Sequence, residues 1–502
     1  MGATKPRTTR GSGWTRLLAA LTLAMASRSS EATAQKASDA GESDAGSPAV
    51  RVFYAWMNAF NSTDTSAKQA FIADHLADSM RRGRSVSELV ERDRELAARV
   101  GGFELAKMEQ ATDAEVTALL RERAGHRGYA RLHLELEPGN HQTVRALQIS
   151  PVEGNGAAPA RRLTGAELKA DVTKRLDQLA SEDKFSGVVL MAKDAQILFA
   201  RAYGYADRGK KARNTLETKF NLGSMNKMMT AVAVAQLVQG GKLKFTDTVA
   251  QLLPDYPDRA NAAKISVHHL LTHTSGLGDF FGQEYRERRA SLHTLSDYLP
   301  LFAGKPLQFE PGSFWAYSNA GFLLLGLIIE KVSGQNYFDY VRERIFEPAK
   351  MTHSGWYAQG DGVSQLAVGY TERNSTDGGR VPNAEVTAVR GTSAGGGYST
   401  AGDLLNFSLA LRAHQLLDER NIALLWSGKV RPRHEPDEEY GYGFSVKTID
   451  GHRIIGHGGG APGINADFSV YLDSGYTVIV LSNYDPPSAG AVAAFVQQRI
   501  LL

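Results

Sequence analysis

The chain contains no cysteine, which excludes disulfide bonds, thiolate-bound zinc, a cysteine nucleophile and a lipid-modified N-terminal cysteine. Long apolar runs are also missing, and none reaches the ~20 residues that a helix needs to span a bilayer. Nor is there a long run of Lys or Arg, the pattern that attracts nucleic acid. We therefore expect no membrane span and no nucleic-acid partner, and a fold that depends on its core alone.

The N-terminus has a basic region followed by an apolar one. Five of the first 34 residues are basic and one is acidic, the apolar stretch is Leu17–Ala26, and Ala32-Thr33-Ala34 forms a small-x-small site. This order is typical of a secretory signal peptide, so we expect residues 1–34 to be removed and the protein to be exported, to the periplasm or the cell exterior. Removing this segment, whose net charge is +4, changes the formal charge of the chain from +3 to −1.

Composition predicts a small domain in the first third of the chain. Residues 35–48 have almost nothing to bury and are interpreted as a flexible spacer. Residues 49–152 contain two helical patterns, at Val52–Phe60 and Val86–Val100, and then an alternating strand pattern at Leu132–Leu136. Helices followed by a strand hairpin predict a small α+β domain, which is similar to nuclear-transport-factor-like domains.

Residues 153–163 are interpreted as a linker, and a second domain is predicted over residues 164–502. Thr164-x-x-Glu167 has the capping-box pattern that begins a helix. Two strands are predicted within Phe185–Arg201, and further strands before a C-terminal helix are predicted near Gly443–Lys447, Arg453–Ile455, Asp467–Leu472 and Thr477–Ser482. The sequence therefore predicts an α+β domain in which both ends form one antiparallel sheet and a helical body is inserted between them.

The pattern Ser-x-x-Lys, which places a serine and a lysine on one helix face, occurs twice. Ser181 and Lys184 lie at the polar end of a predicted helix, where charged residues are typical of a solvated terminus. Ser224 and Lys227 open a helix that is almost wholly apolar from Met228 to Val238, and such a helix is buried. Burial disfavours the charged form of Lys227 and leaves a neutral amine that can act as a base. The alternative is a chance serine beside a lysine that extends to solvent.

Two further elements follow in the chain. Tyr317-Ser318-Asn319 is the only Tyr-x-Asn, and it precedes the apolar run Phe322–Ile329. A phenol can relay a proton and an amide can bind a lysine or a substrate, although the same residues are also ordinary where a loop begins a helix. His457-Gly458-Gly459-Gly460 follows the strand-like Ile454-Ile455. Glycines let a strand approach a substrate backbone closely, and the alternative is a flexible glycine hairpin.

With these three elements in this order, residues 164–502 resemble the serine hydrolase family that contains class C β-lactamases, the penicillin-binding D-Ala-D-Ala carboxypeptidases, D-aminopeptidases and related esterases. Accessory stretches of the family are matched at Leu270–Leu277, Phe309–Gly312 and Gly396–Asp403. The resemblance implies a β-lactamase/transpeptidase-like fold. It also implies a packed, structural His273, no metal and no cofactor.

The resemblance further assigns a role to each site residue. Ser224 is expected to attack a carbonyl, while Lys227 and Tyr317 move the proton. Asn319, His457 and Gly459 are expected to contact the substrate, and the backbone N–H groups of Ser224 and Gly460 to form the oxyanion hole.

One departure from the family bears on the substrate. Class C β-lactamases have Lys-Thr-Gly where this chain has His457-Gly458-Gly459. A largely neutral imidazole and a glycine supply neither a fixed charge nor a hydroxyl for a substrate carboxylate. We therefore expect a serine hydrolase that forms an acyl-enzyme with a small-molecule or peptide substrate, either an ester or a D-amino-acid amide or peptide. The alternatives are a β-lactam hydrolase and a non-catalytic cell-wall or penicillin-binding sensor. The pocket walls are expected from Phe280–Leu301 and Tyr357–Arg390.

Overall fold

The computed structural model of the chain describes residues 47–77, 80, 85–123, 129–152, 164–357, 361–373, 379–432, 438–449 and 451–501. The chain divides near residue 156 into two compact units. The predicted signal peptide, most of the predicted spacer and the predicted linker lie outside the described residues. No described helix is long and apolar enough to cross a membrane.

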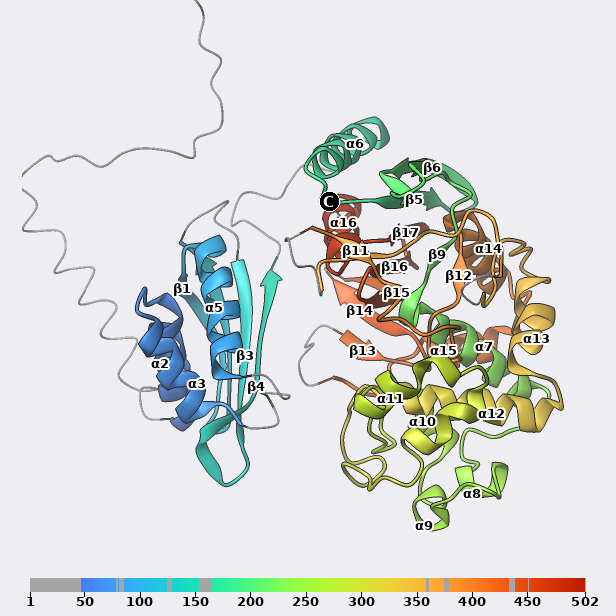
Figure 1. Ribbon diagram of the computed structural model, residues 1–502, viewed down its shortest axis with the longest axis horizontal. Helices are drawn as coiled ribbons and strands as arrows, with labels where there is room; N and C mark the ends of the chain where they lie inside the picture. The colour runs from blue at the N-terminus through green and yellow to red at the C-terminus, as the bar shows by residue number, and fades with distance from the viewer. Residues whose placement is uncertain are drawn as a thin grey trace, which may run out of the picture. The chain divides into compact units, whose positions relative to one another are not determined.

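The first unit is a four-stranded antiparallel sheet with three helices in its described part (Figure 1). Its elements are α2 (Pro48–Asn61), α3 (Thr65–His75), α5 (Val86–Val100), β1 (Phe103–Ala111), β2 (Glu115–Glu122), β3 (Tyr129–Glu137) and β4 (Asn140–Val152). The apolar stripe of α2 packs on the sheet, and its Trp56 and Phe60 stack at 5.1 Å between ring centroids. The predicted α+β class is confirmed.

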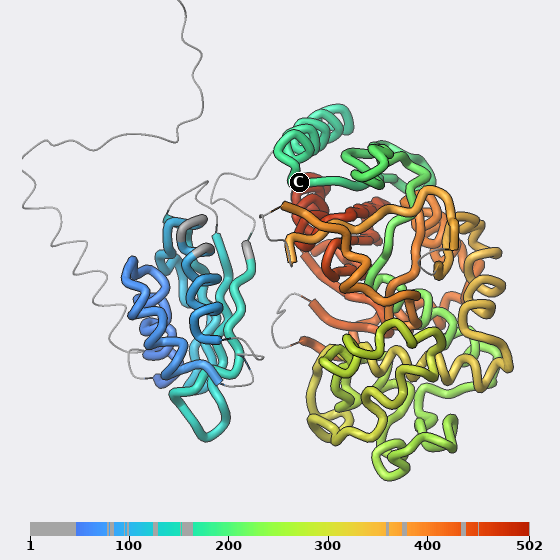
Figure 2. Tube along the Cα trace, in the orientation of Figure 1, coloured from blue at the N-terminus to red at the C-terminus, as the bar shows by residue number. Residues whose placement is uncertain are grey.

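The second unit is built on a seven-stranded antiparallel sheet, in the order β13-β14-β15-β16-β17-β5-β6 (Figure 1). Both ends of the unit supply its strands, which are β5 (Gly187–Lys193), β6 (Gln196–Tyr203), β13 (Glu438–Tyr440), β14 (Ser445–Ile449), β15 (His452–Ala461), β16 (Ile464–Tyr471) and β17 (Tyr476–Ser482). Figure 2 shows the green β5–β6 hairpin beside the red β17, as the pairing of Ser482 with Gly187 requires. The predicted sheet made from both ends is confirmed.

The sheet is covered on both faces, so residues 188–192 of β5 and 478–481 of β17 are apolar on both sides. Val188 and Leu190 of β5 face the helical body, whereas Val189 and Met191 face α6 (Gly165–Ser181) and α16 (Ser488–Leu501). The capping box predicted at Thr164 begins α6. The Gly-rich residues 456–461 lie inside β15 and not after it, because β16 pairs with this strand as far as Ala461, whereas β14 pairs with it only up to Gly456.

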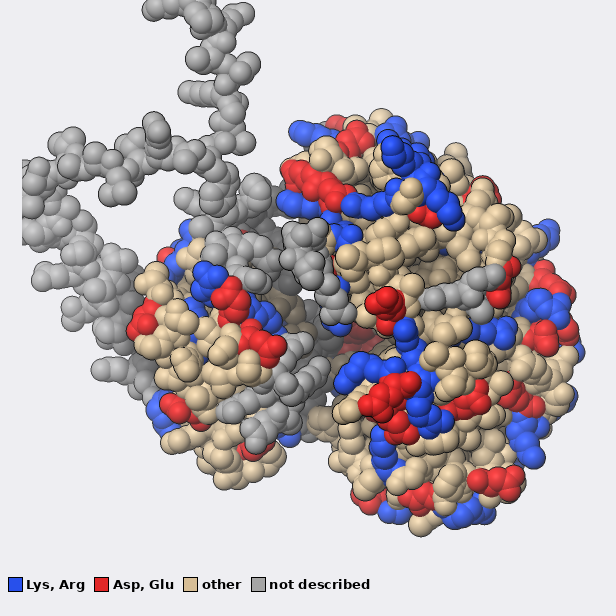
Figure 3. Space-filling model, viewed as in Figure 1, with Lys and Arg blue, Asp and Glu red and all other residues tan. Residues whose placement is uncertain are grey.

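The inserted body is mainly helical. Its helices are α7 (Asn226–Gln239), α8 (Val249–Leu252), α9 (Arg259–Ala262), α10 (Val267–Leu271), α11 (Gln283–Arg288), α12 (Asn319–Ser333), α13 (Tyr337–Val341), α14 (Ala401–Arg412) and α15 (Glu419–Trp426). Short strand pairs also occur there: β7 (Tyr205–Asp207) with β8 (Ala212–Arg213), β9 (Phe220–Asn221) with β12 (Tyr398–Ser399), and β10 (Tyr370–Thr371) with β11 (Val381–Pro382). On the face drawn in Figure 3, acidic and basic side chains are interspersed over this unit.

Candidate active site

Ser224 lies where a strand meets a buried helix. β9 leads into the 3-10 turn Gly223–Met225, and α7 follows directly. Gly223 has a φ of +51°, in the left-handed region that glycine tolerates, and donates its N–H to Oδ1 of Asn221 over 2.9 Å. This tight turn holds Ser224 half-buried at the start of α7, where it keeps part of its surface exposed.

Lys227 is fully enclosed one turn into α7, with an exposed fraction of 0%. Its Nζ donates to Oγ of Ser224 at 3.2 Å, to Oδ1 of Asn319 at 2.7 Å and to the carbonyl of Ala394 at 2.6 Å. Burial lowers the pKa of Lys227 to about 7, and the Asp279 carboxylate opposes this shift only in part. A large fraction of the amine is therefore neutral near pH 7, with a lone pair that can accept the proton of Ser224.

Tyr317 and Asn319 are placed by the start of α12. Ser318 is the N-cap of this helix, and its hydroxyl accepts the N–H of Gly321. The Tyr317 ring lies 4.7 Å from Nζ of Lys227, and the nearby Ser224 hydroxyl acts to lower the pKa of the Tyr317 phenol. The Tyr317 residue is 38% exposed, but desolvation of its phenol raises the phenol's pKa, so the hydroxyl keeps its proton near neutral pH.

Asn319 connects the lysine to a carboxylate. Its Oδ1 accepts from Lys227, and its Nδ2 donates to Oδ2 of Asp279 at 2.7 Å. The two bonds fix the orientation of the amide, because only its oxygen can accept and only its nitrogen can donate. Asn319 thus holds the lysine in place, and Asp279 holds Asn319.

The glycine strand β15 packs directly on the turn that holds Ser224. A Cβ atom added to Gly459 would lie 2.0 Å from the carbonyl oxygen of Leu222 and 3.2 Å from the backbone nitrogen of Ser224. A Cβ atom added to Gly223 would lie 3.0 Å from the nitrogen of Gly460. Only glycines permit this approach, in which β15 packs on the turn beside the backbone nitrogens of Ser224 and Gly460.

The two histidines near the site are buried and neutral. Burial lowers the pKa of His457 to about 3, and nearby Lys227 shifts it in the same direction. Burial likewise puts the pKa of His273 well below its ordinary value. The His273 ring packs on Tyr317 with 4.2 Å between ring centroids, and its nitrogens contact Ser318 and Tyr440. The predicted packed role of His273 is confirmed.

The second Ser-x-x-Lys copy is a helix end, as its context predicts. Ser181 is the last residue of α6, and its hydroxyl donates to the carbonyl of Gln178. The Lys184 side chain is 65% exposed and pairs with Glu182. In the described part of the chain, no group of three or more His, Asp or Glu residues is placed to hold a metal ion.

The structure adds three site residues that the sequence patterns did not single out. They are Asp279, which bonds Asn319; Ala394, whose carbonyl accepts from Lys227; and Tyr440, which contacts both His273 and His457. The glycine run Gly395–Gly397, next to Ala394, is a sequence signal for a close approach of two backbone segments. In the structure, a Cβ at Gly395 would lie 2.7 Å from the carbonyl oxygen of Gly223. Asp279 and Tyr440 carry no comparable signal.

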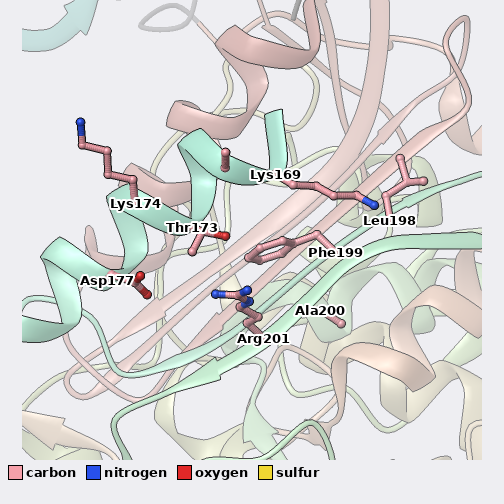
Figure 4. A pocket seen from close by; sticks show the side chains of 9 residues that line it. Lys169, Thr173, Lys174, Asp177, Leu198, Phe199, Ala200 and Arg201 are labelled. Carbon is pink, nitrogen blue, oxygen red and sulfur yellow. The ribbon is translucent and has the colours of Figure 1, made fainter. Parts of the chain in front are cut away.

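Two cavities in the described part of this unit can be compared with this cluster. The larger, of about 780 Å³, is formed by α6 and β6, and Figure 4 shows Arg201 beside the Phe199 ring while Lys174 points away from it. None of its lining residues belongs to the site around Ser224. The smaller, of about 380 Å³, includes Asn221 and is walled partly by the predicted segment Tyr357–Arg390.

The second unit is similar to proteins of a known family. The family model described as Beta-lactamase matches residues 172–501. A penicillin-binding protein of Bacillus subtilis (strain 168) is 30% identical over 320 residues, which are 61% of this chain and 70% of that protein. A penicillin binding protein from Bacillus halodurans, known from its crystal structure, is 36% identical in sequence. The two structures match with a TM-score of 0.60 over 64% of this chain and 98% of that one. A D-stereospecific amidohydrolase from Streptomyces is 25% identical with a TM-score of 0.54, over 65% and 97% of the two chains. The chain therefore belongs to the Beta-lactamase family and is a serine hydrolase.

Proposed function

We propose that this hydrolase transfers the acyl group of an ester or a D-amino-acid amide first to Ser224 and then to water. Oγ of Ser224 attacks the carbonyl carbon while the amine of Lys227 takes its proton. The oxyanion is held by the N–H groups of Ser224 and Gly460. The bond to the leaving group then breaks, and the proton reaches that group through Tyr317. Water then attacks the acyl-enzyme through the same steps, the bond to Ser224 breaks, and the serine oxygen regains a proton as the acid is released.

One observation supports this proposal above the others. Lys227 is fully buried, donates to both Ser224 and Asn319, and has a pKa lowered to about 7. A lysine kept in a protein only for stability would be poorly placed here, because burial of its charge is costly. The same arrangement argues against a non-catalytic sensor, since ligand binding alone needs no buried base beside a serine.

The neighbourhood of His457 supports the choice of substrate. With its pKa lowered to about 3, the imidazole supplies no positive charge for a carboxylate at any ordinary pH. Esters and amides without a free carboxylate at this point fit such a site better than β-lactams do. The amidohydrolase relative, described as D-stereospecific, favours the D-configured amide among these. Hydrolysis of nitrocefin at ordinary enzyme concentration would instead favour the β-lactam hydrolase.

The serine can be identified with a fluorophosphonate probe. We expect intact-mass and peptide mass spectrometry to show one adduct per chain, on the peptide that contains Ser224. A Ser181→Ala variant is the matched control because it removes the serine of the other Ser-x-x-Lys copy, and its labelling should equal that of the wild type. An adduct on Ser181, or on a serine outside the site, would contradict the proposal.

The pH dependence should report Lys227. The base is the neutral amine, whose fraction grows as the pH rises through the pKa. We therefore expect kcat/KM for an uncharged p-nitrophenyl ester to increase with pH and to level off above about pH 7. The ordinary lysine pKa of 10.5 would put this rise far into the alkaline range. A profile that stays flat from roughly pH 5 to 9 would contradict the role of Lys227.

A further inference from the structure

A chain of hydrogen bonds crosses the site behind Tyr317. The N–H of Ser318 lies 3.1 Å from Nδ1 of His273, and Nε2 of His273 lies 3.3 Å from the hydroxyl of Tyr440. That hydroxyl lies 3.0 Å from Nε2 of His457, whose Nδ1 contacts the carbonyl of Gly458. All three side chains are buried. This series of hydrogen bonds therefore joins two backbone groups through three buried side chains.

The two backbone ends fix the direction of every bond. The Ser318 N–H can only donate, so Nδ1 of His273 accepts and its proton sits on Nε2. The Gly458 carbonyl can only accept, so Nδ1 of His457 carries the proton and its Nε2 accepts. The Tyr440 hydroxyl must then accept from His273 and donate to His457. A single arrangement satisfies all the groups, and it requires both rings to be neutral.

The two ends of this series of hydrogen bonds lie on the segments that carry the catalytic groups. Ser318 stands between Tyr317 and Asn319, at the first turn of α12. Gly458 precedes Gly459 and Gly460 on β15. The ring of His273 also lies on the Tyr317 ring. The positions of the Tyr317 phenol and the Asn319 amide relative to the glycine strand β15 thus depend on this series of hydrogen bonds.

We propose that His273 and Tyr440 are positioning residues, which hold Tyr317 and Asn319 in register with the oxyanion-binding strand. They touch neither Ser224 nor Lys227 through any hydrogen bond of the described structure, and they act through Ser318 and His457. The inference rests on the proposed acyl-transfer function, because it assigns these residues to the geometry of that reaction. The hydroxyl of Tyr440 is the central link, since it is bonded on both sides.

A pair of tyrosines two residues apart allows a matched test. Tyr442 is also buried, and its hydroxyl bonds Nδ1 of His268 at 2.9 Å, outside the chain that crosses the site. Tyr442→Phe therefore removes one tyrosine–histidine bond outside the site, whereas Tyr440→Phe removes the two that meet at its hydroxyl. We expect Tyr440→Phe to lower kcat for a p-nitrophenyl ester by roughly 10- to 100-fold with KM nearly unchanged, because misplaced catalytic groups slow the reaction without weakening binding. Tyr442→Phe should keep kcat within about threefold.

The comparison separates positioning from stability. Equal losses of kcat in the two variants, or no loss in Tyr440→Phe, would overturn the inference. The rate of fluorophosphonate labelling is measured on the same samples. If the wild type is not labelled at Ser224, the proposed function fails and the role of Tyr440 fails with it. If the wild type and Tyr440→Phe are labelled at the same rate, only the positioning role is overturned.

A measurement on the unmutated protein tests the bond directions directly. Nitrogen-15 NMR of the imidazole rings should find opposite neutral tautomers, with the proton on Nε2 in His273 and on Nδ1 in His457. Both rings should stay neutral from about pH 5 to 8, because burial lowers both pKa values. The same tautomer in both rings, or a charged ring at pH 7, would overturn the chain as described.

Discussion

Replacing Lys227 by methionine should lower the turnover of a p-nitrophenyl ester roughly 10²- to 10⁴-fold, the range expected when a general base is removed. Methionine is of similar length and fits a buried apolar helix, so the change removes the amine with little change in volume. The Nζ atom is the group that contacts Ser224, Asn319 and Ala394 together, and no other described amine lies in this cluster. The rise of activity through about pH 7 should vanish with it.

The control for this variant is Lys184→Met. It removes the lysine of the other Ser-x-x-Lys copy, whose side chain is largely exposed and pairs only with Glu182 among the described ion pairs. Turnover should stay near the wild-type value, because exposed pairs of this kind contribute little to stability and this one lies outside the site. Circular dichroism and a thermal melt show how much of each variant is folded. Turnover by Lys227→Met within a few-fold of wild type would contradict the assignment of the base.

The choice between the two Ser-x-x-Lys copies could be made from the sequence, for a physical reason. Burial of a helix is decided by its own side chains, and the apolar residues after Lys227 predict it without knowledge of any neighbour. The same holds for β5 and β17, whose residues 188–192 and 478–481 are all apolar because both faces of the sheet are covered. Local patterns thus predicted the buried helix that begins beside Ser224 and the sheet that supports it.

Other parts of the site depend on distant contacts and could not be predicted in this way. The carbonyl of Ala394 reaches Lys227 across 167 positions of sequence, and Tyr440 reaches His273 across the same number. A backbone carbonyl has no signature in the sequence, and one tyrosine among 18 has none either. In the first unit, α3 was not predicted because its few buried side chains, which include Lys68, do not form an apolar stripe.

Replacing Gly459 by alanine should cause the second largest loss of activity. We expect kcat to fall roughly 10²- to 10³-fold, as when one oxyanion donor is removed. The new Cβ would lie 2.0 Å from the Leu222 oxygen, a separation that carbon and oxygen do not tolerate. The atoms nearest to the new Cβ, in Leu222 and Ser224, all belong to the backbone, so no flexible side chain can move aside. The strand must shift away from the turn, which separates the N–H groups of Ser224 and Gly460.

A matched clash elsewhere in the sheet shows whether this loss is specific. A Cβ at Gly187 would lie 1.9 Å from the Leu481 oxygen, where β5 pairs with β17 and no catalytic group is near. Gly187→Ala should therefore lower the melting temperature about as much as Gly459→Ala does, yet keep kcat per folded molecule. If both variants lose kcat equally, the loss reflects a weakened sheet and the N–H groups on β15 have no special part in the reaction. If only Gly459→Ala loses it, the spacing between β15 and the Ser224 turn controls the chemistry.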